Sequence, residues 1–113
     1  MSKESVEDIR ATIELINQTL KAFRDSSVIF ANKEIEYKKA KAIAYTQLDS
    51  TLKNKELRES AVMEKTEEQY RLSKKWEIAV EIEREQLRAL RDILSAQQSI
   101  NASLDKEITN GRN

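Results

Sequence analysis

The sequence predicts an all-α protein, folded as a long antiparallel helical hairpin of the coiled-coil type. Among its 113 residues there is one glycine and no proline, so little in the chain ends a helix or forms a tight turn. Apolar residues recur every three or four positions in both halves, which is the 3.5-residue repeat of a coiled-coil seam. With 39% hydrophobic and 35% charged residues, the chain suits helices with a narrow apolar stripe better than a thick core.

The first helix is expected over residues 5–49, with Ser5 as its N-cap. Its seam is formed by Val6, Ile9, Ile13, Ile16, Leu20 and Phe23. After Phe23 the apolar spacing slips at residues 25–27 and resumes at Val28. Because neither glycine nor proline lies there, a stutter inside one continuous helix is favoured, and a break recapped by Ser26 or Ser27 is the alternative.

A turn is expected at about residues 49–54, where Asp, Ser, Thr and Asn cluster, because these residues favour turns and caps. The second helix then covers residues 55–110, so that residues 1–113 form a single hairpin domain. Its seam is formed by Trp76, Val80, Leu87, Leu90, Leu94, Leu104 and Ile108, interrupted by Glu83, Gln97 and Asn101.

Folding the chain back at this turn predicts a register in which opposite residues have numbers that sum to roughly 104. Val28 is then opposite Trp76, and Phe23 is opposite Ile82. Two helices shield only part of their stripes, so we expect a homodimer that forms a four-helix assembly. Four apolar residues off the seam either make that second contact or widen the intramolecular stripe; they are Ile29, Phe30, Ile78 and Ile93.

The composition argues against an enzyme, a metal site and a cofactor. The chain has no histidine and no cysteine, and no glycine-rich loop that could hold a phosphate. Carboxylates at helical spacing, such as Glu77 and Glu81, are interpreted as part of a solvated face with i,i+4 charge pairs, such as Glu77–Glu81–Arg84–Arg88 and Glu34–Lys38. No apolar stretch is long enough to cross a bilayer and no signal core begins the chain, so a cytoplasmic protein without membrane contact is expected.

Charge is balanced overall but is unevenly placed. Between Lys33 and Lys75 there are eleven basic and eight acidic residues. Aromatic and basic side chains interleave in this half of the hairpin, and the candidate binding face consists of Tyr37, Lys38, Lys39, Lys41, Tyr70, Lys74 and Lys75. Proteins that bind single-stranded nucleic acid combine rings that stack on bases with cations that meet phosphates. The alternative interpretation is a solvated lysine surface.

The order of several short features resembles small all-helical accessory proteins encoded in phage and prophage recombination and replication clusters. The features are Glu36 to Ala42, Thr51, Arg58, Ala61, Trp76, Ala79, Glu81, and Leu87 to Ser99. They span about two thirds of the chain. The resemblance implies an accessory role beside phage enzymes that handle DNA, in the host cytoplasm, and it supplies no functional residues.

From the sequence we expect a non-enzymatic adaptor that binds a DNA recombination, replication or host-defence protein. Two other functions stay open. One is direct binding of single-stranded nucleic acid by the Lys/Tyr-rich half, with an affinity that falls as salt rises. The other is a structural or scaffold coiled coil whose partners are copies of itself.

Overall fold

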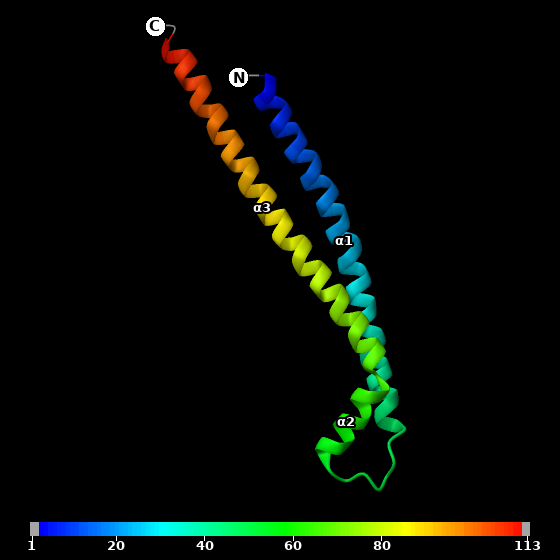
Figure 1. Ribbon diagram of the computed structural model, residues 1–113. Coiled ribbons are helices and arrows are strands. Elements are labelled where there is room, and N and C mark those ends of the chain that lie inside the picture. Colours follow the sequence, from blue (N-terminus) through cyan, green and yellow to red (C-terminus); the bar gives the residue numbers. More distant parts are fainter. Residues whose placement is uncertain (1–2, 112–113) are drawn as a thin grey trace. The chain divides into compact units, whose positions relative to one another are not determined.

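A computed structural model describes residues 3–111 of the chain, and the side chains of residues 3–108. These residues form three helices and no strand: α1 (Lys3–Thr46), α2 (Lys55–Lys65) and α3 (Glu67–Gly111) (Figure 1). The all-α prediction is therefore confirmed. The first helix ends three residues earlier than predicted, and the second predicted helix is divided at Thr66 into α2 and α3.

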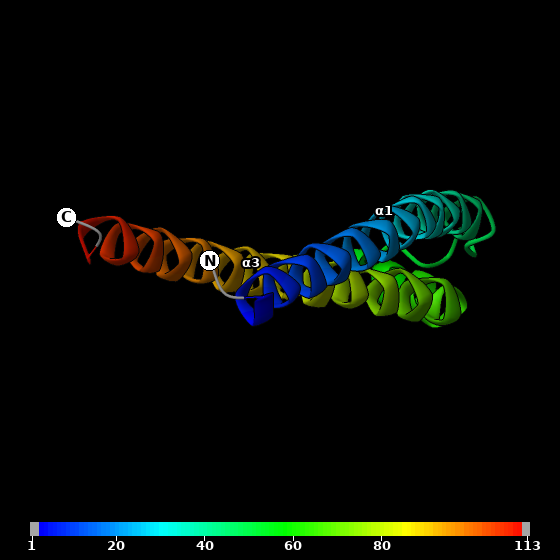
Figure 2. The ribbon, with the colours of Figure 1, turned by 90° about the horizontal axis from the view of Figure 1, so that it is seen from above.

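The helices are organised in two compact units. Unit 1 contains Met1–Phe23 and Ile82–Asn113, and unit 2 contains Arg24–Glu81. Within each unit, a segment of α1 runs antiparallel to a segment of α3, and both views show the opposite directions (Figures 1 and 2). The predicted antiparallel helical hairpin is thus confirmed.

The inward side of α1 follows a 3.5-residue repeat, which we call the α1 core line. Its buried and half-buried members are Ser5, Ile9, Thr12, Ile16, Thr19 and Phe23 in unit 1, and Ser26, Phe30, Lys33, Tyr37, Ala40 and Ala44 in unit 2. The helix continues through residues 25–27, which confirms the favoured continuous helix and makes the alternative break wrong. The repeat of buried positions also continues there, so the expected slip in the inward line does not occur. Val28, which the slip would bring onto the seam, is 62% exposed.

Small hydroxyl residues explain why the apolar spacing alone misplaced this line. Thr12 is buried on it, whereas the neighbouring Ile13 of the predicted seam is 42% exposed. The Thr12 hydroxyl donates a hydrogen bond to the Asp8 carbonyl oxygen at 3.0 Å. A threonine that bonds back to the preceding turn has no unsatisfied polar group, so it can occupy an inward position that a search for apolar residues passes over.

The inward side of α3 also follows a 3.5-residue repeat, the α3 core line. Its members in unit 2 are Gln69, Ser73, Trp76 and Val80, and in unit 1 they are Glu83, Leu87, Leu90, Leu94, Gln97, Asn101 and Leu104. The residues that interrupt the apolar pattern therefore lie on the inward side. The side-chain oxygens of Gln69 and Gln97 and both polar atoms of Asn101 are buried without a hydrogen-bond partner among the described residues.

The register differs from the predicted one by about three residues. In unit 2 Tyr37 contacts Tyr70, and in unit 1 Phe23 contacts Arg84, so opposite residues have numbers that sum to 107. Phe23 therefore does not meet Ile82, which is 53% exposed, and the predicted pairing of Val28 with Trp76 is also wrong. The difference arises where the chain turns, because an eight-residue loop and the separate helix α2 replace the short turn that the prediction assumed.

Local hydrogen bonds define the connection in unit 2. The Asp49 carboxylate accepts a hydrogen bond from the Thr51 backbone N–H at 2.9 Å. The Asn54 side chain caps α2 by accepting hydrogen bonds from the backbone N–H groups of Glu56 at 2.8 Å and Leu57 at 3.4 Å. The Arg58 guanidinium donates to the Leu52 carbonyl oxygen at 3.0 Å, which ties the loop to α2.

The break between α2 and α3 occurs at Thr66, which is buried. Both its backbone N–H and its hydroxyl donate to the carbonyl oxygen of Val62, at 3.0 and 2.8 Å. A hydroxyl that shares a helical carbonyl in this way weakens and bends a helix, which suits the break at this position. Val62, with 1% of its surface exposed, is the most buried apolar residue that the structure describes, so the short helix α2 is anchored in unit 2 by its side chain.

Candidate functional site

Two shallow depressions, one in each unit, bring functional side chains together. The first lies in unit 2 between α1 and α3 and has a volume of about 250 Å³. Its lining residues are Phe30, Glu34, Tyr37, Lys38, Tyr70, Ser73, Lys74 and Glu77. Four members of the predicted binding face, Tyr37, Lys38, Tyr70 and Lys74, therefore meet here from two different helices.

The two tyrosines form the centre of this Lys/Tyr depression. The ring centroids of Tyr37 and Tyr70 are 5.5 Å apart and their planes are inclined by 66°, which is an edge-to-face arrangement. The ammonium nitrogens of Lys41 and Lys74 lie 5.8 Å from the centroids of the Tyr37 and Tyr70 rings, respectively. Lysines at this distance from a ring face are within the range of cation–π attraction.

Carboxylates neutralise part of the lysine charge at this depression. Lys38 forms an ion pair with Glu34 at 3.0 Å, as the i,i+4 pattern predicts, and Lys74 forms one with Glu77 at 3.1 Å. The hydrogen bond from the Lys74 ammonium to Glu77 raises the pKa of Lys74 above its ordinary value. An anionic ligand would have to compete with both glutamates for the lysines.

The remaining members of the predicted face do not line the depression. Lys39 is exposed, and the Lys75 ammonium lies 5.8 Å from the centroid of the adjacent Trp76 ring. Trp76 is half-buried on the α3 core line, as its place on the predicted seam indicates. The lysines are thus spread around the helices, and only Lys38, Lys41 and Lys74 gather near the tyrosine pair.

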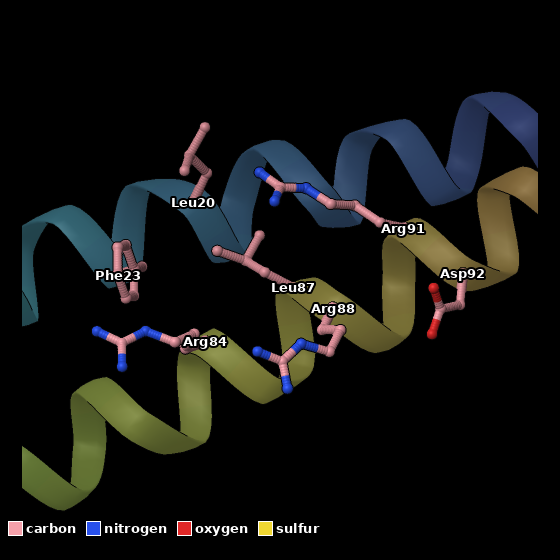
Figure 3. A pocket seen from close by; sticks show the side chains of 7 residues that line it. All are labelled: Leu20, Phe23, Arg84, Leu87, Arg88, Arg91 and Asp92. Atoms are coloured by element: carbon pink, nitrogen blue, oxygen red, sulfur yellow. The ribbon is translucent and has the colours of Figure 1, made fainter.

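The second depression lies in unit 1, where side chains of α1 and α3 line a volume of about 310 Å³ (Figure 3). We call it the arginine depression. It is lined by Leu20, Phe23, Arg84, Leu87, Arg88, Arg91 and Asp92. Sequence reasoning interpreted these arginines as partners in solvated charge pairs and missed the site. Their spacing of four and three residues, which puts them on one side of α3, is the signal that could have revealed it.

Neither depression has the residues of a metal site. Among the described residues, no group of three or more His, Cys, Asp or Glu side chains could hold a metal ion. Within the same residues, no helix is both long and apolar enough to cross a bilayer. The Lys/Tyr depression combines two lysines and two glutamates with aromatic side chains, whereas the arginine depression combines three arginines and one aspartate with apolar side chains.

Comparisons with protein-family models, curated proteins and solved structures found no significant match to this chain. What the chain binds therefore has to be inferred from its own side chains.

Proposed function

We propose that this chain is a non-enzymatic interaction protein that forms a homodimer and serves as an adaptor for another protein. One observation carries the proposal. Among the described residues only four apolar side chains are buried, Ala44, Val62, Val80 and Leu87, whereas fourteen large apolar side chains are exposed. Large exposed apolar surfaces are typical of proteins that associate with a partner.

The self-association would use a second apolar stripe on α3 in unit 1. Ile82, Ile93 and Ile100 are all about half exposed. Ala89, Ile93, Ala96 and Ile100 follow one another at spacings of four, three and four residues, and Ile82 lies seven residues before Ala89. This stripe is separate from the α3 core line, so the hairpin leaves it uncovered. A 3.5-residue repeat of isoleucine and alanine suits close packing against another helix. Of the four residues first considered for such a contact, Ile78 and Ile93 are exposed, while Ile29 and Phe30 are half-buried.

The mass in solution tests this step. We expect the wild-type chain to be a dimer by light scattering after size-exclusion chromatography, and Ile93→Glu to be a monomer. Ser99→Glu adds the same charge to α3 at an exposed polar position, so it is the matched control and should remain a dimer. A wild-type chain that stays monomeric at high concentration would contradict the proposal.

The adaptor role is supported by the resemblance to phage accessory proteins and by the two depressions, each of which is lined by side chains of both α1 and α3. In that role the chain acts in the host cytoplasm and binds a recombination, replication or host-defence protein. Rigid helices would present the side chains, and the mechanism would be steric. If copies of itself were the only partners, the chain would be a scaffold, and substitutions in the depressions would leave its assembly unchanged.

A second candidate function is direct binding of single-stranded nucleic acid by the Lys/Tyr depression. It is favoured by the tyrosine pair, whose rings lie beside Lys41 and Lys74. The test is the mass of the protein at low salt with a labelled 30-base single strand. A complex that dissociates as salt rises, and that is lost on charge reversal of Lys38, Lys39, Lys74 and Lys75, would establish this function. An unchanged mass would rule it out.

A further inference from the structure

The arginine depression has an apolar floor and a cationic rim. Leu87 is buried on the α3 core line, and Leu20 and Phe23 are half-buried on α1, so these three side chains form the floor. Figure 3 shows Arg84 and Arg91 reaching from α3 toward α1 on the two sides of Leu87, while Arg88 and Asp92 lie on the outer side. A ligand that enters the depression would therefore meet the apolar side chains of the floor and guanidinium groups at both ends.

The rim concentrates the positive charge of this part of α3. Three of the four basic residues between Ile82 and Gly111 line the depression, whereas Asp92 is the one acidic residue in the lining. Glu85 forms an ion pair with Arg88 at 2.9 Å. For Arg84 and Arg91, by contrast, no ion pair is found among the described residues. Their charge is thus available to an external anion.

We propose that the arginine depression binds an acidic peptide segment that carries a bulky apolar side chain. The apolar side chain packs against Leu20, Phe23 and Leu87, and carboxylates of the segment pair with Arg84 and Arg91. Guanidinium groups suit this role because their planar donors can bind a carboxylate through two parallel hydrogen bonds. The inference rests on the proposed adaptor function and names the chemical class of the partner.

The geometry favours a peptide over a nucleic acid at this site. Phe23 is the one aromatic residue in the lining, and the Arg84 guanidinium already lies over its ring, 5.8 Å from the centroid. Nucleic acid binders without sequence preference offer aromatic rings on which successive bases stack. A volume of about 310 Å³ is at the small end of the range for ligand pockets, which suits one large side chain.

The test uses a short fluorescein-labelled peptide of four aspartates followed by leucine and phenylalanine, with binding followed by fluorescence anisotropy at several salt concentrations. Two altered peptides separate the contributions: one has alanines in place of leucine and phenylalanine, and the other has lysines in place of the aspartates. We expect the wild-type chain to bind the first peptide at least about tenfold more tightly than either altered peptide, because each lacks one half of the recognition.

Variants locate the binding on the chain. Arg84→Glu and Arg91→Glu should each weaken binding of the acidic peptide about tenfold or more, since each places a negative charge beside its carboxylates. Lys106→Glu makes the same charge change on α3 outside the depression and should bind as the wild type does. Circular dichroism verifies that all three variants remain helical.

Each opposing result overturns the inference. Equal binding of the acidic and the alanine-substituted peptide would show that the chain attracts the acidic peptide by charge alone. Unchanged binding by Arg84→Glu and Arg91→Glu would place the peptide-binding site elsewhere on the chain. If the wild-type chain binds a 30-base single strand more tightly than the acidic peptide, and these two variants lose that binding, the depression is a nucleic acid site. If the chain is a dimer that does not bind the peptide, the peptide site is refuted and the proposed self-association is supported. If the chain is a monomer that binds the peptide, the peptide site is supported and the proposed self-association is refuted.

Discussion

Tyr37 on α1 and Tyr70 on α3 meet edge to face, with ring centroids 5.5 Å apart and planes inclined by 66°. The contact joins helices α1 and α3 in unit 2 through residues that are 33 positions apart in the chain. It defines the register of this unit, and it brings Lys41 and Lys74 to the same place, because each lies four residues after one of the tyrosines.

A double-mutant cycle on this pair should reveal a coupling free energy of about 0.5–1.5 kcal/mol, the usual value of an aromatic pair beyond its area burial. The variants are Tyr37→Ala, Tyr70→Ala and their combination, and the free energy of unfolding is measured in urea. The control is a second cycle that combines Tyr37→Ala with Tyr45→Ala, since Tyr45 is exposed and outside the pair. Strictly additive losses for Tyr37 and Tyr70 would mean that the rings do not interact in solution.

Asn101→Leu should raise the free energy of unfolding by about 1–3 kcal/mol. Asn101 is 4% exposed, and neither of its side-chain polar atoms has a hydrogen-bond partner among the described residues. Leucine removes that desolvation cost and adds apolar burial. Thermal unfolding followed by circular dichroism measures the change, and Asn17→Leu at an exposed site of α1 is the control. A large loss of stability would indicate that the amide is hydrogen-bonded in solution.

Loss of the α2 cap should weaken unit 2. Asn54→Ala removes the acceptor for the Glu56 and Leu57 backbone N–H groups and should cost about 0.5–2 kcal/mol of stability. Asn54→Asp keeps an acceptor and places a negative charge at the helix N-terminus, so it should be close to neutral or slightly stabilising. Amide hydrogen exchange over residues 55–65 reads the effect locally. Equal exchange in both variants would contradict the cap.

The Asp49 carboxyl should titrate below its ordinary value of 3.8, because the backbone N–H and the side chain of Thr51 donate to it and lower its pKa. The folded pKa is thus below the unfolded one. The stability that the hydrogen bonds of the Asp49 carboxylate contribute is therefore fully present above about pH 3.8, and it is lost as the pH falls through the folded pKa. Carbon-detected NMR titration follows the group directly.

In Thr51→Ala the backbone hydrogen bond to Asp49 remains and the side-chain one is lost. The pKa of Asp49 should consequently rise part of the way toward the value measured in urea-unfolded chain. A pKa that is equal in the folded and unfolded chain would mean that the loop is open in solution.

Helix type, the direction of the hairpin and the start of α2 at residue 55 could be predicted from the sequence, because they depend on local signals. The apolar repeat and the cluster of Asp, Ser, Thr and Asn provide those signals. The register could not be predicted to better than about three residues, since it depends on the connection, where an eight-residue loop and helix α2 replace the assumed short turn. The α1 core line was misplaced for a different reason, because Thr12 and Ser26 lie inward. An isolated sequence does not distinguish a threonine bonded back to its own helix from one that faces water.

The candidate sites were predictable to a different extent. Tyr37 and Tyr70 were placed in the same half of the hairpin by the position of the turn, and the fold brings them into contact. The arginine depression was missed because Arg84 and Arg88 have carboxylates at helical spacing, which favours the interpretation of a solvated face. Of the two, Arg88 does form such a pair, with Glu85 instead of a residue four positions away. Charge spacing alone does not indicate which arginine stays unpaired.

The unbroken 3.5-residue repeat on α1 and α3 limits how such a chain can change length. Deleting one residue from α1 would rotate every later side chain by about 100° around the helix axis and turn the core line outward. Seven residues make two full turns of the repeat, so a block of seven inserted into α1 is accommodated when an equal block enters α3 at the opposite position. Natural variants of this hairpin should therefore differ in length by paired heptads, with single-residue insertions confined to the loop at residues 47–54.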